Sequence, residues 1–146
     1  MIKLFTIGFT EKSAEQFFTL LKNAKVKKIL DIRISNMSQL AGFSKGTDLE
    51  YFAKAIGNMA YEHNVDLAPT KELMTCYRGK EFTQKEFETK YLKLLESRKI
   101  ARKINFEKLN GTCLLCSEHL PDKCHRKVLA EYLLKLNKNI EIIHLV

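Results

Sequence analysis

The chain has 146 residues, of which 45% are hydrophobic and 29% are charged, and its formal net charge at pH 7 is +8. These values are typical of one globular domain, so we expect residues 1–146 to form a single domain, and they exclude long disordered tracts and repeats. The positive charge attracts polyanions at long range. Because the lysines are spread along the chain without an arginine-rich stripe, the pattern favours a solvated, lysine-rich surface.

The sequence carries no sign of export or of membrane insertion. Met1–Gly8 lacks the basic leader and cleavage site of a secretory signal, and no apolar run approaches the roughly 20 residues that span a bilayer. We therefore expect a cytoplasmic protein without a membrane partner. In that reducing compartment the four cysteines are expected to be free thiols, catalytic groups or metal ligands rather than disulfides.

The first half of the chain alternates strands with helices. Apolar runs predict strands over residues 3–9 and 26–34, and Ser13 precedes a stripe of apolar residues that predicts a helix to about residue 24. Residues 35–45 show no periodicity and are expected to form a long loop, of the kind that often carries function. The next elements expected are a helix over 47–58 and a short strand over 60–65.

The second half continues the alternation after an interruption. Residues 66–80 contain Pro69 and Gly79 and are expected to be irregular, whereas residues 83–104 are expected to form one long helix. The remaining elements expected are a strand over 111–117, a helix over 124–136 and a strand over 140–146. The order βαβαβαβαβ predicts an α/β domain with a mostly parallel five-stranded sheet and helices on both faces.

Polar residues are expected to gather at one edge of this sheet. In open parallel sheets, ligands bind outside the carboxyl ends of the strands. The predicted strand ends and the start of the last helix carry small, titratable and thiol-bearing residues: Gly8, Thr10, Asp31, Arg33, His63, Cys116, Glu118, Cys124, His125 and Arg126. We therefore expect one site built from segments that are distant in the sequence.

Cys124, His125 and Arg126 begin the helix that follows the strand ending at Cys116. A helix N-terminus binds anions and lowers the pKa of a cysteine placed there, so Cys124 is a candidate thiolate. Arg126, together with Arg33 from the neighbouring strand, is a candidate fork for phosphate or carboxylate. The alternative is that Cys116 is a small core residue and the helix start is only polar.

Other cysteines and polar residues are expected to be structural. Cys113 lies three positions before Cys116, so the two side chains point to opposite faces of the strand and do not form a redox dithiol or half of a zinc knuckle. Cys76 lies in the irregular segment and has no expected role. His144 and Tyr77 are expected to pack or to face solvent.

A metal site is a further alternative. Cys116, Cys124 and His125, with His119 or His63, offer the ligand types that zinc prefers. Their spacing matches no standard zinc finger, and a core of this size hardly needs a structural metal, so we expect none. No cofactor follows from the sequence.

Several short motifs stand at the predicted strand ends and helix starts: Thr6-Ile-Gly8, Asp31-Ile-Arg33, Phe43-Ser-Lys45, Tyr61-Glu-His63, Leu115-Cys-Ser-Glu118, Cys124-His-Arg126 and Leu129-Ala130. In this combination the chain resembles the uncharacterised family DUF488 over nearly its whole length. The resemblance implies an α/β fold and a shared site on these residues, but no established reaction. Besides the two arginines, the candidate anion contacts are Gly8, Thr10, Lys45 and His63.

The chain departs from the family pattern in two places. Family members usually carry a histidine where this chain has Phe9, and often a proline-containing stretch where this chain reads Ile34-Ser-Asn-Met-Ser38. If that histidine is the essential base of a family reaction, this protein needs His63, His125 or Glu118 in its place or has lost the activity.

The leading hypothesis is an enzyme that acts on a phosphate-bearing or nucleic-acid-derived ligand. In it, Arg33 and Arg126 hold the anion, and Cys116 or Cys124 acts as nucleophile or essential thiol. Glu118 or His125 moves protons, and Asp31 is a further candidate acid or base unless it is simply paired with Arg33. The alternatives are a non-catalytic nucleic-acid-binding module and a metal-stabilised interaction domain.

Overall fold

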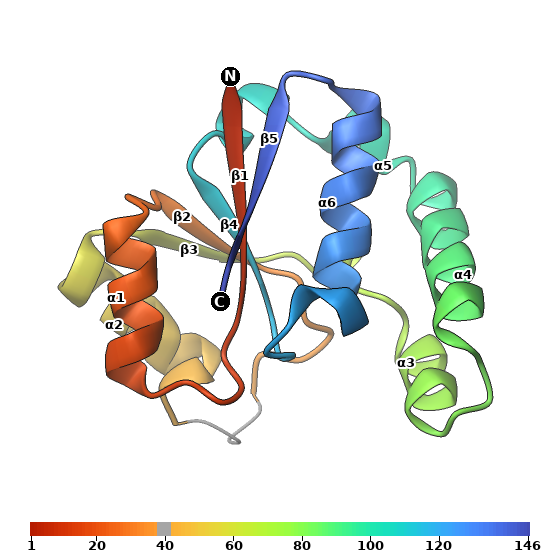
Figure 1. Ribbon diagram of the computed structural model, residues 1–146, viewed down its shortest axis with the longest axis horizontal. Helices are drawn as coiled ribbons and strands as arrows, with labels where there is room; N and C mark the ends of the chain where they lie inside the picture. Colours follow the sequence, from red (N-terminus) through yellow and green to blue (C-terminus); the bar gives the residue numbers. More distant parts are fainter. Residues whose placement is uncertain (38–41) are drawn as a thin grey trace.

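The computed structural model describes residues 1–37 and 42–146 (Figure 1). Five strands form one sheet in the order β3-β2-β4-β1-β5, and every neighbouring pair is parallel. The strands are β1 (Ile2–Gly8), β2 (Lys28–Asp31), β3 (Ala60–His63), β4 (Thr112–Cys116) and β5 (Ile140–Leu145). The α/β class and the parallel five-stranded sheet expected from the sequence are confirmed.

Helices cover both faces of the sheet, as expected (Figure 1). One face carries α1 (Ala14–Asn23) and α2 (Gly46–Gly57). The other carries α3 (Lys71–Arg78), α4 (Gln84–Ser97), α5 (Ile100–Lys103) and α6 (His125–Leu136). Short 3-10 turns are η1 (Gly42–Ser44), η2 (Val65–Leu67), η3 (Phe106–Leu109) and η4 (Pro121–Lys123). No helix in the described ranges is long and apolar enough to cross a membrane.

The core forms one apolar layer on each face of the sheet. Phe17 and Leu21 of α1 pack with Ile7 of β1 on one face, and Leu129 and Leu133 of α6 pack in the layer on the other. Every residue of β4 is buried, whereas the edge strand β3 alternates between exposed and partly buried residues. Central strands of a parallel sheet are covered on both faces, which explains the continuous apolar run that predicted β4.

The chain changes direction across the sheet between β1 and β4. From β1 it runs through α1 to β2 on one side, and from β4 it runs through α6 to β5 on the other. The loops after β1 and β4 therefore leave toward opposite faces, and such a switch point opens a crevice at the carboxyl ends of the strands. Gly8 pairs in register with Cys116, so β1 and β4 end at the same level, at the edge where this crevice opens.

The irregular structure expected over residues 66–80 is wrong, because α3 occupies most of this segment. Thr70 caps the helix by accepting the backbone N–H of Leu73 at 3.1 Å, and Gly79 ends it. Pro69 lies just before the cap, where it interrupts no helical hydrogen bond. The proline and glycine therefore bound a short helix.

The single helix expected over 83–104 is also wrong, because the chain breaks between α4 and α5. Lys99 adopts a left-handed backbone (φ 57°) after α4 ends at Ser97. Arg98 donates at the break to the carbonyls of Asp66 (2.7 Å) and Ala68 (2.6 Å), which ties it to the segment before α3. The loop expected over 35–45 lies in part outside the described residues, and its end forms η1.

Candidate functional site

A cleft with a volume of about 720 Å³ opens at the carboxyl ends of the strands. Thr10 after β1, residues 33–35 after β2 and residues 116–118 at the end of β4 contribute to its lining. The start of α6 adds Cys124 and His125, and α3 adds a further wall. Because small-molecule sites usually enclose about 300–1,000 Å³, the cleft is large enough for a substrate.

Cys116, Cys124 and His125 lie together in this cleft. Cys116 is the last residue of β4, Cys124 is the N-cap of α6 and His125 is its first residue. Their side chains are buried, and one donor atom from each lies within 4.8 Å of the other two. The Sγ atom of Cys124 accepts the backbone N–H of Arg126 at 3.5 Å. The structure therefore brings together the two cysteines and the histidine that sequence reasoning assigned to this edge.

The imidazole of His125 is held by its surroundings. Its Nε2 lies 2.9 Å from the carbonyl oxygen of Ile32, and since a carbonyl only accepts, Nε2 donates the proton. The ring of Tyr91 packs against it in a T-shaped contact, with centroids 5.5 Å apart. The tautomer fixed in this way leaves Nδ1, which lies 3.5 Å from the Sγ of Cys116, able to accept a proton.

The same three residues are the one group, within the described part of the chain, that offers three metal-ligand atoms close together. Two thiols and an imidazole suit zinc. The Sγ of Cys116, however, lies 3.5 Å from Nδ1 and 3.7 Å from Nε2 of His125. A sulfur in the plane of the imidazole, at nearly equal distances from both nitrogens, would overlap the ring carbon between them. The Cys116 sulfur therefore lies over the face of the ring. Nδ1 is therefore not aimed as in a preformed metal site.

The two thiols differ in acidity. Burial raises the pKa of Cys116, and the neighbouring Cys124 raises it further. Burial also opposes ionisation of Cys124, but hydrogen bonds with Cys116 and His125 and the positive charge of Arg126 outweigh it and lower the pKa of Cys124. Cys124 is therefore the thiol that ionises first, with Cys116 as its hydrogen-bond donor.

Arg33 is a buried guanidinium that lines the cleft. Its Nε and Nη2 donate to the two carboxylate oxygens of Asp31 at 2.9 and 2.7 Å, and Nη2 also donates to the carbonyl of Ser44 at 2.7 Å. Nη1 is buried and has no hydrogen-bond partner among the described residues. An unpaired buried donor costs about 1–3 kcal/mol, so this nitrogen marks a place where a ligand oxygen would be stabilising.

Asp31 positions Arg33. Besides the guanidinium, its carboxylate accepts the backbone N–H of Arg33 at 3.1 Å and the hydroxyl of Tyr61 at 2.6 Å. Burial by itself disfavours the charged guanidinium, but the hydrogen bonds and charge of Asp31 outweigh it and raise the pKa of Arg33. Arg33 therefore stays a cation in the cleft. The oxygens of Asp31 are already hydrogen-bonded, so Asp31 holds the guanidinium in position.

Arg126 is fully buried, and all three of its guanidinium nitrogens have partners in the protein. Nη1 and Nη2 donate to the carbonyls of Glu118 (2.5 Å) and His119 (3.0 Å), and Nε donates to the Oγ1 of Thr6 (3.4 Å). Gly8 permits this close approach, because a Cβ there would overlap the Glu118 carbonyl. Arg126 and Gly8 thus hold the loop after β4 in place, and neither lines the cleft.

Phe9 stands where family members usually carry a histidine. Its ring packs against the guanidinium of Arg33, with 5.2 Å between the Cζ of Arg33 and the ring centroid. Of the three residues considered as replacements for that histidine, His125 and Glu118 line the cleft. His63 does not line it and instead bonds the carbonyl oxygen of Arg33 through Nε2 at 2.7 Å. His125 is therefore the imidazole closest to the two thiols.

Of two other candidate anion contacts, Thr10 lines the cleft and Lys45 does not. Thr10 is exposed and lines it, and both its backbone N–H and its hydroxyl donate to the carbonyl of Ser117. Lys45 is the N-cap of α2 and does not line it. The strand-end residues within the cleft are thus Thr10 and Arg33, together with the segment that begins at Cys116.

The wall formed by α3 was missed by sequence reasoning. Met74 and Tyr77 line the cleft, and Tyr77 stacks on Phe87 of α4 with ring centroids 4.4 Å apart. Lys71 and Arg78, at the two ends of α3, are exposed and also line the cleft. The cap at Thr70 and the 3–4 spacing of apolar residues were present in the sequence and would have indicated this helix.

The remaining cysteines lie away from the cleft, in agreement with the sequence. Cys113 is buried in the apolar layer under α1 and α2, on the opposite face of β4 from Cys116. Burial raises the pKa of Cys113. Cys76 lies on α3, half-buried, and does not line the cleft. All four cysteines are free.

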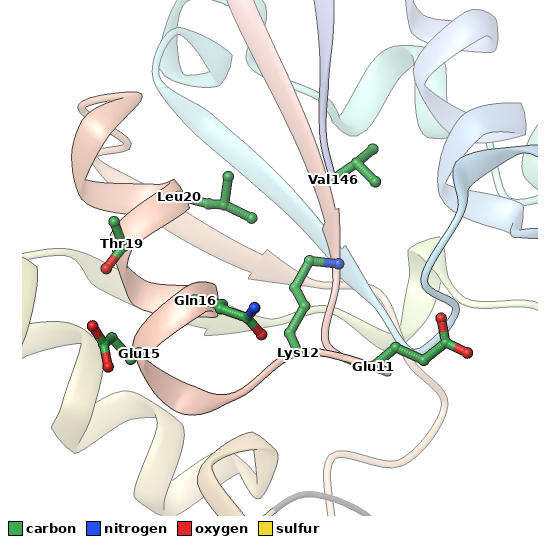
Figure 2. Close-up of a pocket in the computed structure, with 7 residues that line it drawn as sticks. All are labelled: Glu11, Lys12, Glu15, Gln16, Thr19, Leu20 and Val146. Atoms are coloured by element: carbon green, nitrogen blue, oxygen red, sulfur yellow. The ribbon is translucent and has the colours of Figure 1, made fainter.

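A second, more open hollow of about 360 Å³ lies between the start of α1 and the end of β5 (Figure 2). Glu11, Lys12, Glu15 and Gln16 supply its polar groups, with Val146 on the strand side. The ammonium of Lys12 lies 3.2 Å from Nδ1 of His119. None of the described residues that line the hollow offers a thiol or a buried unpaired donor, so the larger cleft is the candidate site.

Comparison with known proteins gives one result. Residues 13–133 match the model of a family described as a domain of unknown function, DUF488. Neither the curated proteins nor the solved structures gave a significant match. The matched range covers most of the chain and includes Arg33, Cys116 and Cys124, the residues that the cleft brings together. This chain therefore belongs to the DUF488 family.

Proposed function

We propose that this chain is an enzyme that acts on a phosphate-bearing ligand bound in the cleft, with Cys116 and Cys124 as its essential thiols. The observation that carries the proposal is that Arg33, whose buried Nη1 has no partner among the described residues, lines the same cleft as the two thiols. A planar guanidinium donates well to phosphate oxygens, and a charge-assisted hydrogen bond in a partly enclosed site is stronger than one between neutral groups.

The charge of the cleft supports an anionic ligand. Three cationic side chains line it, Arg33, Lys71 and Arg78, against the single carboxylate of Glu118. The local excess of positive charge raises the concentration of anions near the cleft. The overall charge of +8 acts in the same direction.

The thiols and the proton-transfer groups complete the proposed site. Cys124 is the nucleophile, since it is the thiol whose ionised form the surroundings stabilise. Cys116 donates to it, and His125, which also forms a hydrogen bond with Cys124, is the base that receives the Cys124 proton. Protonated His125 then passes this proton to a leaving group, directly or through Glu118, which is exposed at the cleft.

Alkylation of the cysteines in the presence of phosphate tests the proposal. The reduced protein is treated with iodoacetamide, and modification of each cysteine is followed by peptide mass spectrometry with and without inorganic phosphate. We expect phosphate to slow modification of Cys116 and Cys124 in the wild type, to have little effect in Arg33→Lys, and to leave Cys76 unchanged in both. Equal rates with and without phosphate in the wild type would refute the anion site.

Cysteine variants separate catalysis from simple binding. If the site is catalytic, Cys124→Ser retains phosphate binding and loses turnover of whichever phosphate-bearing substrate a screen identifies, whereas Cys76→Ser retains both. A protein that binds nucleic acid with a steep salt dependence and is indifferent to both Cys116→Ser and Cys124→Ser would instead be a non-catalytic binding module.

A further inference from the structure

The cleft is larger and more apolar than a phosphate group requires. Its volume is about 720 Å³, and only part of that space lies near the unpaired nitrogen of Arg33 and the two thiols. The remaining lining includes a set of apolar side chains from the β2 loop, α3 and α4: Ile34, Pro69, Met74, Tyr77 and Phe87. A ligand that filled the cleft would therefore carry an apolar part besides its anion.

The apolar wall is built around two stacked rings. Tyr77 and Phe87 lie with their ring planes 20° apart and their centroids 4.4 Å apart, and Phe87 in turn stacks near Tyr91 at 6.1 Å. Phe87 and Tyr91 are buried, whereas Tyr77 is only partly buried and lines the cleft. The row of rings thus begins in the core and ends at Tyr77, which a planar ligand ring can extend by stacking.

The flexible neighbour of Tyr77 suits the same kind of ligand. Met74 lies three residues before Tyr77 on α3, so both side chains stand on one face of the helix, and both line the cleft. A thioether side chain adapts its shape to an aromatic ring and makes favourable contacts with it. The exposed cations Lys71 and Arg78 flank this face, which favours an anionic aromatic ligand over a neutral one.

We propose that α3 selects a nucleotide, whose planar base lies on Met74 and Tyr77 while its phosphate is held by Arg33. This inference rests on the proposed function, because it takes the anion site at Arg33 as given, and it adds the class of substrate. Small sugar phosphates and inorganic phosphate occupy the anion end alone. Stacking of a base on an aromatic side chain is worth at least about a tenfold change in affinity in comparable sites.

Calorimetric titration with four probes tests the inference on the full, reduced protein. The probes are inorganic phosphate, ribose 5-phosphate, adenosine 5′-monophosphate and adenosine. We expect the nucleotide to bind at least about tenfold more tightly than ribose 5-phosphate. In Tyr77→Ala this preference disappears while affinity for inorganic phosphate is retained, and retention of phosphate binding shows that the variant is folded. Tyr51→Ala, which removes an exposed tyrosine of α2 outside the cleft, keeps the preference.

The outcomes separate the two proposals. Equal affinities for ribose 5-phosphate and the nucleotide, or a preference unchanged in Tyr77→Ala, overturn the inference about α3 and leave the anion site standing. Failure of all three phosphate-bearing probes to bind overturns the proposed function and the inference with it. Adenosine that binds as tightly as its monophosphate overturns the coupling between the base wall and Arg33.

Discussion

Arg33 and Arg126 are both buried arginines at the edge of the sheet where the two cysteines lie, and they differ in how many of their guanidinium nitrogens have a hydrogen-bond partner. Every nitrogen of Arg126 meets an oxygen of the protein, so its bonding capacity holds the loop after β4. Arg33, which lines the cleft, is paired on one side with Asp31, and its buried Nη1 has no partner in the described structure. The comparison teaches that a buried cation indicates a ligand only when the fold leaves it unsatisfied.

The largest effect is expected from removing Arg126. In Arg126→Met the carbonyls of Glu118 and His119 lose charged donors, and bonds of that kind contribute about 1.5–3 kcal/mol each. We expect the free energy of unfolding to fall by about 3–4 kcal/mol, which corresponds to a drop in Tm of about 10 °C for a chain of this size.

Thermal unfolding followed by circular dichroism measures this change. Arg102→Met is the matched control, because Arg102 lies exposed on α5, and its Tm should stay within about 2 °C of the wild type. A Tm of Arg126→Met equal to that of the control would show that the guanidinium does not hold the loop.

A smaller loss is expected when the loop is pushed away from β1. In Gly8→Ala the added Cβ overlaps the carbonyl of Glu118, so the loop held by Arg126 must shift. Overpacking of this kind costs about 1–3 kcal/mol. Denaturant unfolding measures it, with Gly42→Ala as the control, since a Cβ at Gly42 meets no neighbour among the described residues. If both variants unfold at the same denaturant concentration, the close approach at Gly8 does not contribute to the free energy of unfolding.

Arg33 is expected to behave in the opposite way, with a small effect on stability and a large effect on binding. Arg33→Lys keeps a cation beside Asp31 but removes the unpaired Nη1 and one of the two parallel bonds to Asp31. Because loss of an unpaired buried donor offsets part of the lost bond, the loss of stability should be about 1 kcal/mol. Its dissociation constant for inorganic phosphate should rise at least about tenfold, as expected for loss of one charge-assisted bond. Calorimetric titration measures this constant, and an unchanged value would remove Arg33 from the anion site.

The smallest effect is expected in the pH dependence of stability, through His144, which contacts the same Thr6 hydroxyl as Arg126. Burial, and then the charges of Arg126 and Lys127, lower the pKa of His144, whose Nδ1 lies 2.6 Å from the Oγ1 of Thr6. Because the unfolded chain takes up this proton first, stability should fall as the pH drops below about 6.5, the ordinary histidine value, and level off once it passes the folded pKa.

Urea unfolding between pH 7.5 and 5 measures this slope. His144→Asn removes the titrating group, so the variant should lose less stability than the wild type over the same range. All other groups are the same in both proteins, so their contribution cancels in the comparison. Parallel curves for the two proteins would show that His144 is not held neutral by its surroundings.

The fold was predictable because its strands and most of its helices have clear local sequence patterns. The apolar run of β4 and the cap at Ser13 are signals that tertiary structure reinforced. The edge at which Cys116 and Cys124 meet also followed from the sequence, since the carboxyl ends of parallel strands share one side. By contrast, α3 was missed because it is short and fully buries only Leu73, which made Pro69 and Gly79 look like loop residues.

The difference between Arg33 and Arg126 was beyond sequence reasoning. Both stand beside strand ends or helix starts, and both were expected to hold an anion. Which of them is satisfied depends on how closely residues 117–119 approach β1 and α6, and that distance is set by packing at Gly8. Local sequence does not encode a contact of this kind, so the number of unpaired donors emerges only in the folded chain.

The most direct test of this account follows the side-chain resonances of the arginines by NMR while inorganic phosphate is added to the ¹⁵N-labelled, reduced protein. Assignments come from Arg33→Lys and from the spectrum of the wild type. The account predicts that the guanidinium signals of Arg33 shift with saturation while those of Arg126 stay in place. Signals of Arg33 that do not move, or movement at Arg126 instead, would contradict it.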